Sequence, residues 1–153
     1  MRKAVAKLVG ENNVSGVVTF EQSEPMAGTK VTASFEGLPQ GKHGFHIHEF
    51  GDTTNGCTST GAHYNPFGHD HGGPQSSERH IGDMGNVESS GEDPTIFEIT
   101  DDSITLCGPY SVLGRAVVVH ADQDDLGQGG WEDSKITGHA GARLACGVIG
   151  WAT

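Results

Sequence analysis

Basic residues, cysteines and long apolar runs are all scarce in this sequence. Only nine Lys and Arg residues stand against 20 Asp and Glu, which gives a formal net charge of −11. Nucleic acids and acidic membrane surfaces bind clustered cations, and the few cations here are scattered, so we expect neither partner. No segment approaches membrane-spanning length, and the first ten residues lack the apolar run of a signal peptide. These absences predict a mature, soluble protein of the cytoplasm.

Several short motifs that mark common enzyme classes are also missing. The sequence contains no HExxH, CxxC, GxSxG or EF-hand string, and Gly127–Gly130 lacks the spacing of a dinucleotide- or phosphate-binding loop. The cysteines are Cys57, Cys107 and Cys146, and this odd count allows at most one intrachain bridge. Any chemistry must therefore come from a different set of residues.

Short segments in which apolar and polar residues alternate recur along the chain, and this period of two is typical of β-strands. The segments are Lys3–Val9, Gly16–Gln22, Lys30–Phe35, His43–Glu49, Met84–Val87, Thr95–Thr100, Gly114–His120 and Ala145–Ile149. The length of 153 residues predicts one domain, residues 1–153, and the 24 glycines suit tight turns between strands. We predict an all-β fold, an eight-stranded Greek-key flattened barrel or sandwich.

Two long segments, 50–82 and 121–143, interrupt this pattern. Both are rich in Gly and Asp and show no helical periodicity. Loops of this length are uncommon in compact domains and usually carry function. Both adjoin histidines, so we expect the functional site where these loops meet the strands.

Seven residues form a candidate metal-ligand set. His46 and His48 are two apart in a predicted strand and should project from the same face, and His120 ends another apolar strand. The first long loop adds His63, His71, His80 and Asp83. Neutral imidazole suits copper and zinc, and no carboxylate-rich cage is present for calcium or magnesium. The spacing favours two adjacent cations that share one imidazole.

A simpler interpretation treats the nine histidines as ordinary core and surface residues. That interpretation suits any single histidine. It does not explain why His46 and His48 share one strand face while the first long loop carries His63, His71, His80 and Asp83 at spacings typical of metal ligands. We assign it to His43, His69 and His139, of which His69 is the doubtful case because it lies two residues from His71.

Beyond these patterns, the chain resembles the eukaryotic-type, cytosolic copper/zinc superoxide dismutases over nearly its whole length. The segments that carry the resemblance are Gly44–Asp52, Gly61–Pro66, His71–Pro74, Glu78–Asp83, Gly114–His120, Asp124–Gly127 and Gly141–Gly150. Each segment alone is a moderate signal, but together and in this order they are specific.

The resemblance implies one copper and one zinc ion per subunit. The implied copper ligands are His46, His48, His63 and His120, and the implied zinc ligands are His63, His71, His80 and Asp83. His63 would be the bridge, because an imidazole that has lost its second proton can bind a metal through each ring nitrogen. The zinc shell would be closed and structural.

The resemblance also gives roles to two charged residues. Asp124 would accept N–H bonds from His46 and His71 and so hold both metal sites in register; alternatively it is a solvated turn residue. Arg143 would dock the superoxide anion, although a lone Arg most often forms a surface salt bridge. Members of the family commonly carry several lysines in the second loop, whereas here five acidic residues stand against Lys135 and Arg143, so electrostatic steering should be weaker.

A bridge between Cys57 and Cys146 is implied by the resemblance, and it would pin the first long loop to the strand that follows Arg143. Two free cysteines are the alternative. Cys107 has no evident partner and is either a small buried hydrophobe or an exposed thiol.

The implied reaction is the disproportionation of superoxide. Our hypothesis is a two-step cycle in which one superoxide reduces Cu(II) and leaves as O2, and a second oxidises Cu(I) and leaves as hydrogen peroxide, with His63 relaying a proton. One alternative is a copper/zinc-binding or buffering protein without catalysis. Another is the dismutase-like domain of a copper chaperone.

The resemblance implies two protein partners. One is a second copy, bound through Phe50, Gly51 and Gly147–Trp151, although Trp151 could instead cover the barrel end of a monomer. The other is a copper chaperone that loads the metal.

Overall fold

The first three strands show alternating burial along their length. In β1 (Arg2–Gly10), Ala4, Ala6 and Leu8 are fully buried and alternate with more exposed residues. The same period of two runs through β2 (Ser15–Gln22) and β3 (Thr29–Glu36). One face of each strand therefore supplies the core, as the sequence pattern predicts. This computed structural model describes all residues, 1–153.

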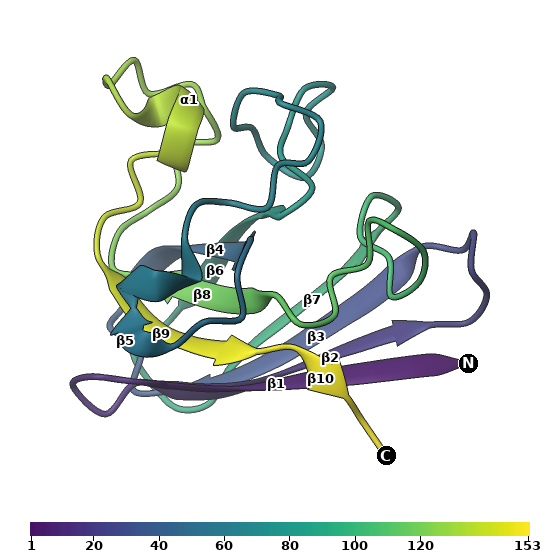
Figure 1. Ribbon diagram of the computed structural model, residues 1–153. Coiled ribbons are helices and arrows are strands. Elements are labelled where there is room, and N and C mark those ends of the chain that lie inside the picture. Colours follow the sequence, from purple (N-terminus) through teal and green to yellow (C-terminus); the bar gives the residue numbers. More distant parts are fainter.

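The strands form one antiparallel sheet that curls into a nearly closed barrel (Figure 1). The remaining strands are β4 (Gly41–His48), β5 (Thr54–Cys57), β6 (Asp83–Ser89), β7 (Thr95–Asp101), β8 (Ala116–His120), β9 (Arg143–Val148) and β10 (Gly150–Trp151). Their order in the sheet is β6-β4-β8-β9-β1-β2-β3-β7, with β10 paired to β1. The predicted all-β barrel is confirmed, and each predicted strand lies within two residues of an observed one at both ends.

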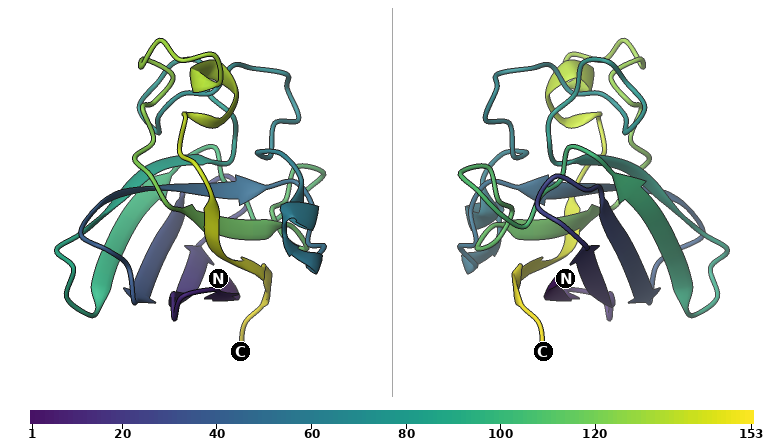
Figure 2. Two further views of the ribbon diagram at one scale, coloured as in Figure 1. Left: turned by 90° about the vertical axis from the view of Figure 1, so that its left-hand side faces the viewer. Right: turned by 90° about the vertical axis from the view of Figure 1, so that its right-hand side faces the viewer.

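The two long loops rise from the same side of the barrel (Figures 1 and 2). The first contains β5 and the 3-10 helix η1 (Thr58–Thr60), and the second contains the short helix α1 (Ser134–Thr137). The prediction of wholly irregular loops was therefore wrong in detail, because elements of three or four residues are too short to show a period. None of the helices has the length or apolar character that a bilayer crossing requires.

Strands β4 and β8 are buried on both faces. Phe45 and Ile47 of β4 belong to the hydrophobic core, where the Phe45 ring packs edge-on against Phe35 with their centroids 5.5 Å apart. The intervening residues, His46 and His48, point away from this core and are also buried, since they are 0% and 1% exposed. The outer face of β4 must therefore be covered by the loops.

Candidate metal centre

Strand pairing places three of the predicted ligands on one face. In the antiparallel register His46 lies opposite Val118 of β8, and His120 is two residues farther along that strand. The His46 and His120 ring centroids are consequently 4.8 Å apart. The first loop folds over this face, and its His63 forms an isolated β-bridge with His48.

Four buried histidines make the first group of converging side chains. One ring nitrogen from each residue lies within 4.8 Å of the corresponding nitrogens of the others, and the four residues are His46, His48, His63 and His120. The Nε2 atoms of His48 and His120 are 3.4 Å apart. The Nδ1 atoms of the same two rings donate to the carbonyl oxygens of Gly61 and Gly141, at 2.9 and 3.1 Å. Each ring therefore has its Nε2 lone pair free, and the two lone pairs face a common point, which suits a shared cation.

His46 presents Nδ1 to this group, whereas His48 and His120 present Nε2. Its Nε2–H donates to Asp124 Oδ2 at 2.7 Å, which leaves Nδ1 buried and without a hydrogen-bond partner. His63 lies next to it, with ring centroids 4.0 Å apart, and its Nε2 is likewise buried and unpartnered. Buried polar atoms are normally hydrogen-bonded, so orphaned lone pairs in one cluster fit a metal ion.

A second group gathers around the Asp83 carboxylate. Three imidazole Nδ1 atoms lie close to Asp83 Oδ1: those of His63 at 3.1 Å, His71 at 3.0 Å and His80 at 3.2 Å. The other oxygen, Oδ2, accepts backbone N–H bonds from Gly72 and His80 at 3.0 and 2.8 Å. The carboxylate is thus fixed so that Oδ1 points at the imidazoles. Three imidazoles and one carboxylate form a donor set that zinc prefers.

The tightest version of this second group contains His46, His63, His71 and Asp83, with His80 just outside it. We favour His80 over His46 as the fourth donor. His46 has committed Nε2 to Asp124 and turns its free Nδ1 among the first group, whereas His80 Nδ1 is 3.1 Å from His63 Nδ1. His63 is common to both groups.

Asp124 connects the two groups. Its side chain is fully buried, and its Oδ1 accepts the His71 Nε2–H at 2.7 Å while Oδ2 holds His46. The residue is braced by Asn86, whose amide nitrogen donates to the Asp124 carbonyl and whose side-chain oxygen accepts the Asp124 N–H. The structure therefore brings together the three residues that the resemblance linked through this carboxylate.

Burial sets the protonation of the first group. It lowers the pKa of His46, His48 and His63, and it lowers the pKa of His120 to about 4. A buried imidazole resists charging because the low-dielectric surroundings disfavour the cation. At neutral pH these rings are uncharged, which is the form that binds a metal.

The second group behaves differently because it contains a buried carboxylate. Burial opposes the charging of His71, but hydrogen bonds to Asp124 and Asp83 outweigh it and raise the pKa of His71 to about 9. Burial also disfavours the Asp83 anion, yet hydrogen bonds from His63, His71 and His80 hold the pKa of that carboxyl well below its usual range. This pocket stabilises a positive charge beside the Asp83 carboxylate. A metal cation would be stabilised there in the same way as the proton on His71.

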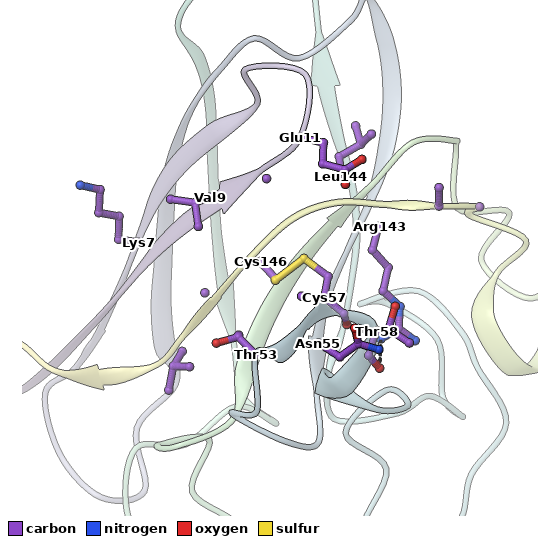
Figure 3. Close-up of a pocket in the computed structure, with 16 residues that line it drawn as sticks. Lys7, Val9, Glu11, Thr53, Asn55, Cys57, Thr58, Arg143, Leu144 and Cys146 are labelled. Carbon is purple, nitrogen blue, oxygen red and sulfur yellow. Dashed lines mark hydrogen bonds between the residues drawn. A yellow bond between two sulfur atoms is a disulfide. The ribbon is translucent and has the colours of Figure 1, made fainter.

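The predicted disulfide between Cys57 and Cys146 is confirmed, and it ties β5 to β9 (Figure 3). Arg143 begins β9 beside it. The Arg143 guanidinium donates through one nitrogen to the Cys57 carbonyl at 2.8 Å and to Thr60 Oγ1 at 3.0 Å. The bridge and the first loop therefore fix the guanidinium. Cys107 is the free cysteine and is partly exposed.

A cavity of about 370 Å³ leads to the first group of histidines. His48, His63, His120 and Arg143 form one part of its lining, and the second loop contributes Asp133, Ile136 and Thr137. A larger hollow of about 860 Å³ lies beside the disulfide and also borders Arg143 (Figure 3), and no histidine lines it. We regard the smaller cavity as the functional one because imidazole nitrogens with free lone pairs converge there.

The sequence analysis predicted the orienting role of Asp124 but missed the backbone groups that orient the other side chains of the site. The carbonyls of Gly61 and Gly141 and the N–H of Gly72 act through the backbone, so residue type gives no direct sign of them. Gly138 leaves a trace: its φ is +73°, and a Cβ there would collide with Asp124 Oδ1. A glycine at such a site admits both a left-handed backbone and the close approach of a carboxylate.

The three histidines to which we gave no ligand role lie outside both groups. Both ring nitrogens of His43 lie against carbonyl oxygens, those of His120 and Pro39, at 2.9 and 2.8 Å. His69 is exposed and contacts the Arg79 carbonyl. His139 is exposed and bonds to Asp133.

The geometry of the site agrees with a comparison of the chain with known protein families. The model of the family described as copper/zinc superoxide dismutase (SODC) matches residues 14–149. The matched segment covers most of the 153 residues and includes both histidine groups and the disulfide. The chain therefore belongs to the copper/zinc superoxide dismutase family, and it is an oxidoreductase that acts on superoxide and uses copper and zinc.

Proposed function

We propose that the first group binds copper and the second group binds zinc. The proposed copper ligands are His46, His48, His63 and His120, and the proposed zinc ligands are His63, His71, His80 and Asp83. The observation that carries this division is the His63 ring, whose Nδ1 lies 3.1 Å from Asp83 Oδ1 while its Nε2 is buried without a partner. A ring held in this way can serve one cation with each nitrogen once both protons are gone.

The reaction converts two superoxide anions and two protons into O2 and hydrogen peroxide. Bound copper supplies a centre that accepts one electron and returns it, which zinc cannot do. His63 would handle one proton: its Nε2 would take up a proton in the reducing half of the cycle and donate it to the product in the other half, while its Nδ1 stays beside Asp83. Solvent supplies the second proton. His63 is thus the proposed general acid.

Arg143 is the proposed docking group for the anion. Its guanidinium lines the cavity together with His63 and His120, and its bonds to the Cys57 carbonyl and Thr60 hold it there. Burial lowers its pKa from the ordinary value, but a guanidinium remains charged at neutral pH. A fixed cation in the cavity favours an anionic substrate over neutral molecules. A copper store would have no use for it, which favours catalysis over simple metal binding.

Metal replacement tests this function. The protein is stripped of metal and refilled with copper alone, zinc alone or both, and superoxide decay is followed for each sample. We expect no activity above the stripped protein with zinc alone, and full activity only when both metals are present. Activity with zinc alone would contradict the proposed roles, and so would crystals of the loaded protein in which the two ions are distant and share no ligand.

We also propose that the protein is a homodimer. Three large apolar side chains, Phe50, Val148 and Trp151, are 54%, 42% and 59% exposed and belong to the segments that the family resemblance implicates. A contiguous apolar patch on a protein surface marks an interaction site, and a second copy of the chain would cover these three side chains. Sedimentation at micromolar protein should give the dimer mass, and Val148→Glu should give the monomer. Ile96→Glu on β7, where the side chain is 66% exposed, is the control that should remain dimeric. A monomeric unmodified protein would contradict the proposal.

We also propose a domain organisation, a cellular location and a route of copper loading for the protein. We infer that residues 1–153 act as one domain, because a single core cluster draws on strands from both halves of the chain. We infer that the enzyme works in the cytoplasm, as its resemblance to the cytosolic type implies. The copper ligands are buried, and this accords with loading by a copper chaperone rather than capture of free ions.

A further inference from the structure

Asp133 is the one carboxylate among the residues that line the 370 Å³ cavity. The cavity also holds Arg143, the proposed docking group. A free carboxylate at this position would repel an incoming anion, in a protein whose formal charge is already −11. The surroundings of Asp133 therefore bear directly on how superoxide reaches Arg143.

Both oxygens of this carboxylate have partners within the second loop. His139 Nδ1 lies 2.7 Å from Asp133 Oδ1, and it must be the donor because an ionised carboxylate only accepts hydrogen bonds. The Thr137 hydroxyl lies 3.3 Å from Asp133 Oδ2. The hydrogen bond from His139 is the main reason that the pKa of Asp133 lies below its ordinary value.

The imidazole that donates this bond is itself held in place. The Trp131 ring stacks on the His139 ring, with centroids 4.5 Å apart and planes 8° from parallel. The main chain of Trp131 is held by Ser134, whose hydroxyl accepts the Trp131 backbone N–H at 2.9 Å, while the residue is 60% exposed. His139 has a φ of +55°, which points its side chain back along the loop towards Asp133. The three side chains of Trp131, His139 and Asp133 therefore form one connected cluster at the cavity.

We propose that His139, supported by Trp131, is a positioning residue for the anionic substrate. By donating to Asp133 it holds that carboxylate and draws its charge away from the path to Arg143. This inference rests on the proposed function, in which superoxide reaches Arg143 through this cavity. The His139 and Asp133 side chains are 47% and 48% exposed, so solvent screens the effect and its size is modest.

A double-mutant cycle on kcat/KM for superoxide tests the proposal. His139→Gly removes the imidazole and accepts the positive φ, and it should lower kcat/KM at low ionic strength by less than about twofold, because about twofold is the effect of a whole unit charge several ångströms from the path in water and this variant only releases the existing charge of Asp133. Asp133→Asn should raise kcat/KM. In the Asp133→Asn background, His139→Gly should cause no further loss. His139→Asn places a side-chain N–H donor near the position of Nδ1 and tolerates the positive φ, so it should recover most of the activity.

Two further measurements separate an electrostatic role from a merely structural one. The difference between His139→Gly and the unmodified enzyme should disappear at high ionic strength. The pKa of Asp133, followed by carboxyl NMR in protein loaded with zinc alone, should rise towards its ordinary value in His139→Gly. This second measurement does not depend on catalysis.

The outcomes distinguish failure of this inference from failure of the proposed function. Equal losses from His139→Gly with and without Asp133→Asn, independent of salt, would overturn the inference and leave the proposed function intact. An unchanged pKa of Asp133 in His139→Gly would overturn it as well. If the unmodified protein, loaded with both metals, had no dismutase activity, the proposed function would fail and the inference with it.

Discussion

Replacing His63 with Ala is expected to lower dismutase activity at least about 100-fold, the lower end of what a positioned general acid contributes. The change removes the ring that belongs to both ligand groups, whereas His46, His48 and His120 remain to hold copper. The variant should therefore retain copper and lose turnover. Superoxide decay and metal content measured on the same sample check both parts of this expectation.

His69→Ala is the matched control for His63→Ala. His69 lies on the same loop, is exposed, and makes only backbone hydrogen bonds apart from its ring contact with the Arg79 carbonyl. Its loss should leave activity and metal content close to those of the unmodified enzyme. Near-full turnover by His63→Ala with both metals present would contradict the proton relay. A variant that lost its copper altogether would instead show that His63 is needed for copper binding and not only for catalysis.

Strand β4, which carries two residues of the site, could be predicted from the sequence because its residue types alternate, although the strand is buried on both faces. In β4, Phe45 and Ile47 alternate with His46 and His48, and this alternation alone places the two histidines on one face. The elements inside the loops could not be predicted in the same way. β5 and α1 have four residues each, and such elements are set by tertiary contacts such as the Cys57–Cys146 bridge.

The residues that converge in the two groups could be predicted, but the nitrogen that each ring presents could not. His46 turns Nδ1 towards the first group because Asp124 takes its Nε2–H, whereas His48 turns Nε2 there because the Gly61 carbonyl takes its Nδ1–H. The orientation of the His46 ring depends on a residue 78 positions away in the chain, and that of the His48 ring on a residue 13 positions away. Sequence spacing contains no information on such orientation, and only the folded loops provide it.

Asp124→Ala is expected to weaken zinc binding by about 10- to 100-fold, the usual effect of removing a partner that orients a metal ligand. The variant would leave the Nε2–H groups of His46 and His71 buried without an acceptor, which costs about 1–3 kcal/mol for each group. Zinc should suffer more than copper, because His71 would lose one of its two carboxylate partners, while His48 and His120 keep their backbone acceptors. Competition with a chelator of known affinity measures the change for each metal.

Asp124→Asn refines this expectation because its shape is nearly unchanged while its hydrogen-bonding capacity is halved. An amide has one acceptor oxygen, so it can accept from His46 or from His71 but not from both. Asn should therefore give an intermediate loss, and the metal that is weakened identifies the histidine that has been released. Asp122→Asn, an exposed carboxylate on the same loop, is the matched control and should bind both metals normally. If Asp124→Ala bound zinc as tightly as the unmodified protein, the carboxylate would not be what holds His71 in place, and the loops would have to keep their register through Asp83 and the backbone alone.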